Sequence, residues 1–280
     1  MRKSFLLSSI AAIATLAAAM TYSSIVSADS AKIIIKGSTT VLPITQKAIE
    51  AYPESVAKKV AISVDGSGSG NGIKAIMDGT CDIANSSRAM KKEELAKAKE
   101  KKLRIKEIVV AWDMIVPVVH PKNPVASLTK DQLKGIYEGT IKNWKEVGGP
   151  DMRIVVISRD TSSGTYEFWY EDVLKKTNVR KDALLQASNG AVVATVANNE
   201  KAIGYIGFGY LNNSIKAVKV NGIEPTLKNA KAKKNRYPIA RELYMYVNEN
   251  KYTPQAKAFV KFLLGKKGQE LVKSAGYIPL

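Results

Sequence analysis

The feature that most constrains the fold is a regular alternation of short β-branched runs with amphipathic stretches. Strand-like runs cover residues 33–35, 60–64 and 81–84, and helix-like stretches cover residues 41–52 and 72–78. Repetition of strand, helix and strand predicts an α/β protein with a largely parallel sheet that is covered on both faces.

A crossing between two lobes is predicted further along the chain. A charged helix pattern at residues 91–102 leads into residues 105–119, an apolar segment that contains Asp113 and Pro117 and is long for one strand. A second set of α/β patterns covers residues 129–137, 153–157, 163–176, 192–199 and 203–206. After the basic, turn-rich residues 220–236, an apolar segment at 239–247 is able to cross back, and residues 254–275 follow one helix pattern.

Two crossings predict two lobes with a cleft between them. The first lobe is expected to comprise residues 29–115 and 238–280, with the last helix packed on it, and the second lobe residues 116–237. About 250 residues outside the export signal described next are enough for one large domain or two of ordinary size.

The first 28 residues have the pattern of an export signal. Arg2 and Lys3 precede an apolar run at residues 5–20, and Val26-Ser27-Ala28 resembles a cleavage site. The mature chain is therefore expected to begin near Asp29 and to be periplasmic. The single cysteine, Cys81, does not stand at the cleavage site, so neither a lipid anchor nor a disulfide is expected, and Cys81 is predicted to be a small buried side chain.

The net charge of +18 falls to +16 when Arg2 and Lys3 are removed. Such a charge is typical of proteins that bind nucleic acid or an anionic surface. However, the basic residues are mostly lysines spread along helix-like segments such as 91–106, without the interleaved aromatic residues that stack on single strands. We therefore expect no nucleic-acid partner, and a solvated lysine surface that attracts anions.

Three clusters rich in Gly, Ser and Thr mark places where a strand pattern gives way to a helix pattern. They are residues 37–40 (Gly-Ser-Thr-Thr), 66–72 (Gly-Ser-Gly-Ser-Gly-Asn-Gly) and 159–165 (Arg-Asp-Thr-Ser-Ser-Gly-Thr). A helix start offers unpaired backbone N–H groups and the positive end of the helix dipole. Because open α/β sheets bind ligands beyond the carboxyl ends of their strands, the clusters predict a shared site for a small oxyanion.

Each cluster also has a simpler interpretation. Ser and Thr are favoured as helix caps, and Pro43 fits a first helical turn, so the first cluster alone is equally consistent with a cap. The third cluster has several such residues and Arg159, whose planar fork of donors suits a tetrahedral anion. Residues 70–75 fit G-x-G-x-x-A, a dinucleotide-binding pattern, but an exported chain meets little nicotinamide cofactor, so no cofactor is expected.

Four segments carry a resemblance to a known family. They are residues 37–43 (GSTTVLP), 68–74 (GSGNGIK), 82–88 (DIANSSR) and 159–165 followed by aromatic residues. Through them the chain resembles the phosphate-binding proteins of ABC-type phosphate importers, a branch of the type II periplasmic binding-protein fold. The resemblance covers essentially the whole mature chain.

The resemblance implies high-affinity binding of inorganic phosphate outside the cytoplasmic membrane and delivery to the membrane permease of an ABC transporter, by a monomer without cofactor or metal. Thr39 and Ser69 would give hydroxyls, Thr40 a backbone N–H and Arg159 the charged contact. The implied phosphate-binding residues are Thr39, Thr40, Ser69, Ser87, Arg159, Ser163, Gly164 and Thr165.

One position departs from the family pattern. In the best-known pattern of the family, an aspartate at this position accepts a hydrogen bond from the protonated oxygen of phosphate and repels sulfate. The matching residue in this chain is Ser87. A hydroxyl accepts that bond but carries no repelling charge, so weaker rejection of sulfate is expected. Asp160, Asp113 or another group is an alternative acceptor, and Arg88 is expected in a surface or sheet-edge ion pair.

Other functions remain as alternatives. Another tetrahedral oxyanion, such as sulfate, arsenate or a phosphonate, would suit the same clusters. A secreted phosphoester hydrolase or a surface adhesin is less favoured. The only histidine is His120, no G-x-S-x-G elbow is present, and no His, Cys and carboxylate cluster has metal-ligand spacing. We therefore expect no enzymatic activity.

Overall fold

The elements of the computed structural model follow the predicted alternation, over residues 31–53, 60–234 and 236–280, which are the residues it describes. The expected export signal lies outside them. The strands are β1 (Ala31–Gly37), β2 (Val60–Val64), β3 (Ile83–Ser86), β4 (Ile105–Val119), β5 (Ser127–Leu128), β6 (Val155–Arg159), β7 (Leu184–Gln186), β8 (Ala202–Gly207), β9 (Lys216–Ala217), β10 (Lys219–Val220) and β11 (Ala240–Asn248). The helices are α1 (Leu42–Glu50), α3 (Ser69–Asp78), α4 (Lys92–Glu100), α5 (Lys130–Glu138), α6 (Gly164–Asp172), α7 (Asn189–Ala197), α8 (Leu227–Ala230), α9 (Pro254–Leu264) and α10 (Lys266–Ser274), with 3-10 turns η1 (Trp144–Val147), η2 (Phe208–Tyr210) and η3 (Glu249–Lys251).

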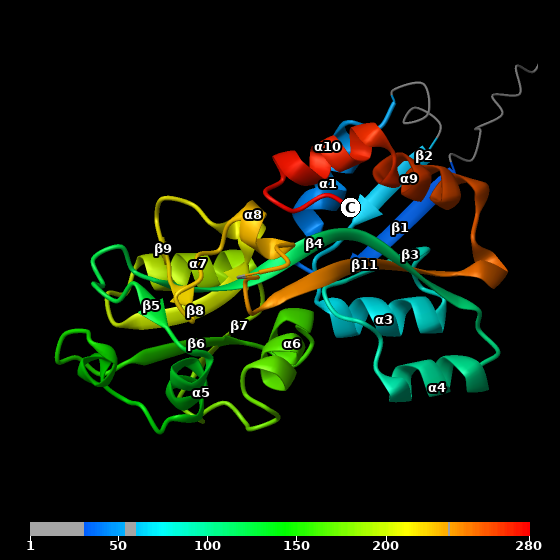
Figure 1. Cartoon of the computed structure of the whole chain (residues 1–280). Helices are drawn as coiled ribbons and strands as arrows, with labels where there is room; N and C mark the ends of the chain where they lie inside the picture. Colours follow the sequence, from blue (N-terminus) through cyan, green and yellow to red (C-terminus); the bar gives the residue numbers. More distant parts are fainter. Residues whose placement is uncertain (1–30, 54–59, 235) are drawn as a thin grey trace, which may run out of the picture. The chain divides into compact units, whose positions relative to one another are not determined.

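One sheet runs through the molecule in the order β2-β1-β3-β11-β4-β8-β6-β7, and β9 pairs with β4 (Figure 1). β1 is parallel to β2 and β3, and β6 is parallel to β7 and β8. The two parallel groups are joined by the antiparallel pair β4 and β11. The predicted crossing segments are therefore these two central strands.

The length of β4 is explained by its two sets of partners. Its residues up to Met114 pair with β11, and its residues from Ile115 pair with β8. Pro117 does not end the strand and lies opposite Tyr205 of β8. A single strand thus passes from one parallel group to the other.

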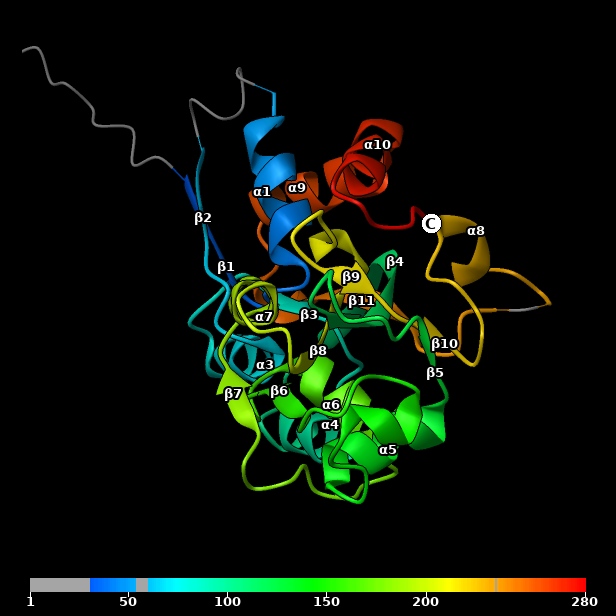
Figure 2. The ribbon, with the colours of Figure 1, turned by 90° about the vertical axis from the view of Figure 1, so that its left-hand side faces the viewer.

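Helices cover both faces of each parallel group (Figures 1 and 2). Around β1 and β11, one hydrophobic cluster joins α1, α9 and α10, and another joins α3 to β3. A third hydrophobic cluster holds α5, α6 and α7 around β6, β8 and the second part of β4. Cys81 is a free, buried cysteine of the α3 cluster, as predicted. The lobe boundaries at residues 115–116 and 237–238 stay a prediction, and Ala31–Leu280 form one compact unit.

The single helix predicted over residues 254–275 is wrong, because the chain forms α9 and α10 there. Gly265 has an extended backbone (ψ 169°) that ends the first helix and caps the second. Both helices turn apolar residues to the same core, including Phe259 and Val272, so hydrophobic periodicity alone does not show the break. None of the described helices is long and apolar enough to span a membrane.

Candidate functional site

The three Gly, Ser and Thr clusters meet around one buried hollow of about 110 Å³. All the residues implied by the resemblance line it, together with two neighbours: Ser38, Thr39, Thr40, Gly68, Ser69, Ser87, Arg159, Ser163, Gly164 and Thr165. The sequence prediction that these separated segments converge is therefore confirmed.

The sheet explains why the segments converge. The first cluster follows β1, and Ser87 follows β3, which is the parallel neighbour of β1. Arg159 is the last residue of β6, and Gly68 and Ser163 are the N-caps of α3 and α6. The hollow therefore lies at the carboxyl ends of strands and at helix starts.

Glycine allows the second and third clusters to touch. A Cβ at Gly164 would lie 2.3 Å from Ser69 Oγ and 2.8 Å from Ser87 Oγ. Gly68 has φ of 103°, and a Cβ there would lie 2.4 Å from Ser162 Oγ. The backbone N–H of Gly70 donates to the Ser162 carbonyl at 2.9 Å. Larger residues at Gly68 or Gly164 would force the two helix starts apart.

Hydroxyl groups line much of the hollow. Thr40 Oγ1 and Thr165 Oγ1 are 3.0 Å apart, and Ser69 Oγ and Ser87 Oγ are 3.2 Å apart. Ser163 Oγ also accepts from the Tyr166 N–H, so it serves as the helix cap that was the simpler interpretation. These hydroxyl groups are available to a ligand as donors or acceptors.

Backbone N–H groups provide further donors. Those of Thr39, Ser69, Gly164 and Thr165 have no acceptor among residues 31–53, 60–234 and 236–280. The Thr40 N–H, expected to face the ligand, donates to Ser38 Oγ at 3.1 Å. The helix starts thus supply unpaired amides, though not the one implied for Thr40.

Arg159 brings a positive charge to the hollow. Its side chain is 1% exposed, Nε donates to the Gln186 carbonyl, and Nη2 donates to the Ala187 carbonyl and to Thr39 Oγ1. Nη1 is buried and has no hydrogen-bond partner within the described part of the chain. Burial lowers the pKa of Arg159, yet an arginine remains charged at neutral pH.

Two polar residues that sequence reasoning missed also reach the lining residues. Arg241 Nη2 donates to Thr165 Oγ1 at 3.0 Å, and Asn189 Nδ2 donates to Thr39 and Thr40 Oγ1 at 3.0 and 3.1 Å. The sequence contained a pattern that could have indicated Asn189, because Ser-Asn-Gly at 188–190 is a fourth helix start rich in small polar residues. Arg241 was visible, beside Glu242, as one of two charged residues in the otherwise apolar segment 239–247.

Neither aspartate considered as an alternative proton acceptor lines the hollow. Asp113 forms an ion pair with Arg241 at 2.8 Å and accepts from the Phe208 N–H. Asp160 accepts from the N–H and hydroxyl of Ser162. Arg88 forms the expected ion pair, with Glu94, through both guanidinium nitrogens at 2.7 and 2.8 Å. Of the three residues considered as acceptors of the phosphate proton, Ser87 is therefore the one that lines the hollow.

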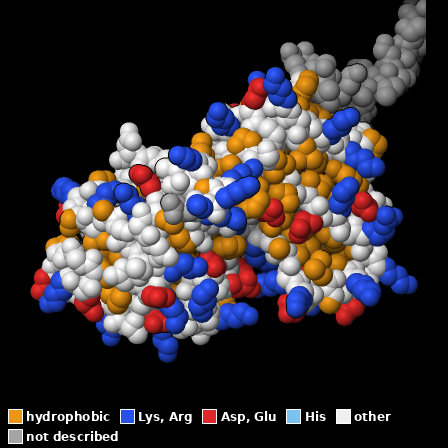
Figure 3. Space-filling view, viewed as in Figure 1, with side chains coloured by type: hydrophobic (Ala, Val, Ile, Leu, Met, Phe, Trp, Pro, Cys, Tyr) orange, Lys and Arg blue, Asp and Glu red, His pale blue; other side chains and the backbone are white. Residues whose placement is uncertain are grey.

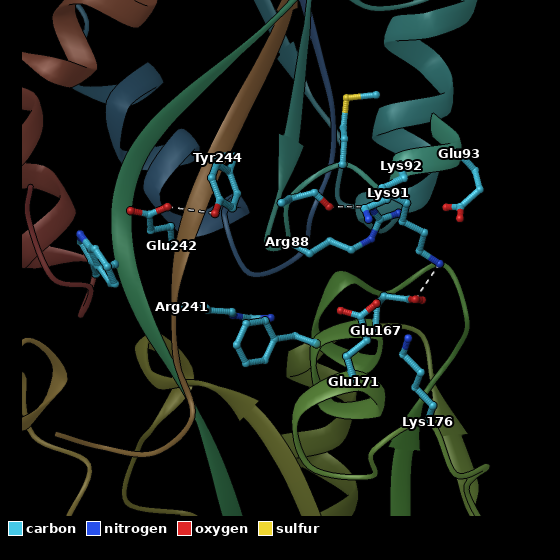
Figure 4. A pocket seen from close by; sticks show the side chains of 14 residues that line it. Arg88, Lys91, Lys92, Glu93, Glu167, Glu171, Lys176, Arg241, Glu242 and Tyr244 are labelled. Atoms are coloured by element: carbon cyan, nitrogen blue, oxygen red, sulfur yellow. Dashed lines mark hydrogen bonds and ion pairs between the residues drawn. The ribbon is translucent and has the colours of Figure 1, made fainter. Parts of the chain in front are cut away.

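A larger groove of about 730 Å³ lies near the hollow but shares none of its lining residues. Figure 4 shows Lys91, at the start of α4, directed toward Glu167 of α6, with which it forms an ion pair at 2.6 Å. This contact joins segments on the two sides of the central strand pair. On the face in Figure 3, lysines and arginines are scattered among acidic residues rather than gathered in one patch.

Comparison with known proteins identifies the relatives of this chain. The family model of the PBP superfamily domain matches residues 23–267. The phosphate-binding protein PstS of Borreliella burgdorferi is 34% identical over 89% of this chain and 91% of its own length. The protein of the same name from Staphylococcus aureus is 36% identical over 86% of this chain and 76% of its own length.

The comparison with solved structures indicates the same family as the comparison with sequences. A phosphate ABC transporter substrate-binding protein from Clostridium perfringens, described with bound phosphate, matches with a TM-score of 0.83 and 36% identity over 89% of this chain and 99% of that chain. An ABC-type phosphate transport receptor from Vibrio cholerae matches with a TM-score of 0.72 and 32% identity over 89% of this chain and 100% of that chain. The predicted α/β architecture of a type II periplasmic binding protein is confirmed. The chain belongs to the PBP superfamily and, within it, to the family of PstS phosphate-binding proteins.

Proposed function

We propose that this protein binds inorganic phosphate in the hollow formed by its three clusters and delivers it to the membrane permease of an ABC-type phosphate transporter. The observation that carries the proposal is the unpartnered Nη1 of Arg159, a buried cation without a carboxylate beside it among the described residues. A buried charge is costly unless it is paired, so an anion in the hollow would stabilise this arginine.

The other lining groups suit the same ligand. Hydroxyls of threonine and serine, together with amides at two helix starts, surround the guanidinium on residues that are all nearly buried. Such donors replace the water shell of a tetrahedral oxyanion, and an arginine fork contacts two of its oxygens. The ligand-binding residues are proposed to be Thr39, Thr40, Ser69, Ser87, Arg159, Ser163, Gly164 and Thr165.

The relatives support phosphate as the ion, because proteins similar to this chain carry that ligand in their names. We infer that the protein works outside the cytoplasmic membrane, since its first residues follow the pattern of an export signal. We also infer that it works as a monomer. We further infer that it binds phosphate without turning it over, because the relatives are named as binding proteins.

Another tetrahedral oxyanion is the second candidate, and Ser87 is the observation that favours it. A carboxylate at this position would repel an anion without a proton, whereas a hydroxyl does not. Sulfate is therefore proposed to compete with phosphate.

Isothermal titration of the protein with phosphate and with sulfate, in a buffer free of both ions, tests the proposal. The protein is first unfolded, dialysed and refolded to remove any bound ion, and reloading with phosphate controls for recovery of the fold. One phosphate bound per chain without release of product from a phosphoester is expected. Absence of binding to either ion, with hydrolysis of a phosphoester, would favour the hydrolase instead.

A further inference from the structure

We propose that Asn189 is a positioning residue that fixes the hydroxyls of Thr39 and Thr40, so that this part of the hollow presents donors to the ligand and favours the phosphate dianion over the monoanion. This inference rests on the proposed function. It concerns which protonation state of the ion the site accepts, and it assigns that choice to a residue that does not line the hollow.

The orientation of the Asn189 amide is determined by a backbone group. The N–H of Gly207 donates to Asn189 Oδ1 at 3.0 Å, and because a backbone N–H only donates, the oxygen must lie on that side. The NH2 group therefore faces Thr39 and Thr40. Asn189 is fully buried at the start of α7, where packing holds this orientation.

The hydroxyl of Thr39 has its acceptor capacity filled. A hydroxyl oxygen has two lone pairs and one proton. Thr39 Oγ1 accepts from Asn189 Nδ2 at 3.0 Å and from Arg159 Nη2 at 3.3 Å. Its own proton is therefore left for an acceptor in the hollow that Thr39 lines.

The Thr40 and Thr165 pair leads to the same result. Thr40 Oγ1 accepts from Asn189 Nδ2 at 3.1 Å and, over a longer distance of 3.5 Å, from Arg241 Nη2, so its own proton is directed to Thr165 Oγ1 at 3.0 Å. Thr165 Oγ1 also accepts from Arg241 Nη2 at 3.0 Å, which fills both of its lone pairs. The proton of Thr165 is therefore left as one further donor for the hollow.

This wall of the hollow consequently presents donors and no acceptor for a P–OH group. A phosphate dianion satisfies donors with more lone pairs and more charge than the monoanion does. Ser87 Oγ, also in the lining, keeps a free lone pair whichever way it shares a bond with Ser69 Oγ, because a hydroxyl oxygen has two lone pairs and this bond uses at most one of them. The one remaining P–OH of the dianion can be accepted there.

The charged and titratable groups around these hydroxyls are Arg159, Arg241, Asp113, Asp160, Arg88, Tyr205 and Tyr210. Burial raises the pKa of Tyr210 to about 12, and burial also raises the pKa of Tyr205. Burial raises the pKa of Asp113 as well, but two guanidinium N–H groups of Arg241 hold its carboxylate ionised. The titrating group is then phosphate itself, whose second ionisation lies near neutral pH.

The first test uses the unmodified protein and two ions. Titration calorimetry from about pH 6 to about pH 8 is expected to show phosphate binding tightening several-fold, since phosphates lose their second proton in this range. Sulfate does not titrate there, so its dissociation constant is expected to stay constant and serves as the control for the protein. Phosphate binding that is flat or that weakens with rising pH would overturn the inference.

The second test is Asn189→Asp, which keeps the shape and the acceptor for the Gly207 N–H. Its carboxylate would accept the protons of Thr39 and Thr40, turn their lone pairs toward the hollow and repel a dianion. At about pH 8 we expect phosphate affinity to fall about 100-fold or more, and binding to tighten as pH falls, opposite to the unmodified protein. Asn123→Asp, at a buried asparagine outside the hollow, controls for an added carboxylate and is expected to bind normally.

The outcomes separate the two proposals. An Asn189→Asp protein that melts normally and keeps the pH direction of the unmodified protein overturns the role of Asn189 alone. An unmodified protein that binds no oxyanion overturns the proposed function together with it. If Asn189→Asp does not fold, phosphate binding by the unmodified protein that is flat or weakens with rising pH still overturns the inference.

Discussion

Two buried arginines near the hollow have opposite surroundings. Arg241, on the central strand β11, forms an ion pair with the fully buried Asp113 of β4. Arg159, at the end of β6, has carbonyl and hydroxyl partners and leaves Nη1 unpaired among the described residues. Both side chains are almost completely buried.

The difference teaches how one residue type serves two purposes. A buried charge paired inside the chain is neutralised permanently, and breaking the pair leaves an uncompensated charge. A buried charge with polar but uncharged partners is oriented but not neutralised, which suits a ligand anion. The position of a carboxylate, rather than the presence of an arginine, therefore distinguishes structural support from ligand binding.

The largest effect is expected on stability when the Arg241 pair is broken. Arg241→Met leaves Asp113 buried without its cation, and the free energy of unfolding should fall by about 3–5 kcal/mol. Urea unfolding of the phosphate-free protein measures this. The double variant Arg241→Met with Asp113→Leu should recover much of the loss. A single variant as stable as the unmodified protein would show that the pair carries no such role.

The next effect concerns binding. Arg159→Ala removes the unpaired cation, and phosphate binding should weaken by roughly 2–4 kcal/mol. The free energy of unfolding without phosphate should change far less than in Arg241→Met, because no buried carboxylate is left behind. Calorimetry and urea unfolding on the same preparation measure both. Unchanged affinity would place the arginine outside the binding site.

A smaller effect is expected when the hollow receives a carboxylate of its own. Ser87→Asp should accept the phosphate proton and repel sulfate, and so raise the preference for phosphate over sulfate by about tenfold, or ~1.4 kcal/mol. Competition between the two ions in calorimetry measures this ratio. A ratio equal to that of the unmodified protein would move the acceptor to another residue.

The smallest effect concerns a third arginine, Arg88, which lines the groove and forms an ion pair with Glu94. Burial alone would raise the pKa of Glu94, but its hydrogen bonds with Arg88 and the Lys91 N–H lower it below the ordinary value. Because the folded-state pKa is depressed, the pair stabilises the protein above the unfolded pKa of about 4.3 and loses this effect as pH falls through the folded value.

Glu94→Gln should therefore lower the free energy of unfolding by about 1 kcal/mol near pH 7 and flatten its decline below about pH 5. Urea unfolding at a series of pH values measures both quantities. Glu93→Gln, next to it in α4 and without an ion pair among the described residues, is a matched control. Equal pH profiles for the two variants would contradict the role of the Arg88 pair.

Much of this arrangement could be predicted from the sequence. Strand and helix periodicity gave the α/β order, and the strand β4 has the bounds expected for residues 105–119. The clusters were recognisable because several Gly, Ser and Thr residues gather at each helix start, whereas a helix cap needs only one. Their convergence followed from the rule that parallel strands bring their carboxyl ends to one edge.

The rest depended on contacts between residues far apart in the chain. Asn189 meets Thr39 and Thr40 across about 150 positions, and no local pattern encodes that distance. The pairing of Asp113 with Arg241 joins two strands in the same way. The break at Gly265 was hidden because the two helices on either side of it share one core.

A crystal structure of the protein with bound phosphate would distinguish the two buried arginines most directly. We expect a phosphate oxygen within about 2.7–2.9 Å of Arg159 Nη1, while Arg241 keeps its ion pair with Asp113. A phosphate bound elsewhere, or one that leaves Arg159 Nη1 unpaired and contacts Arg241 in its place, would contradict the assignment of the hollow as the binding site.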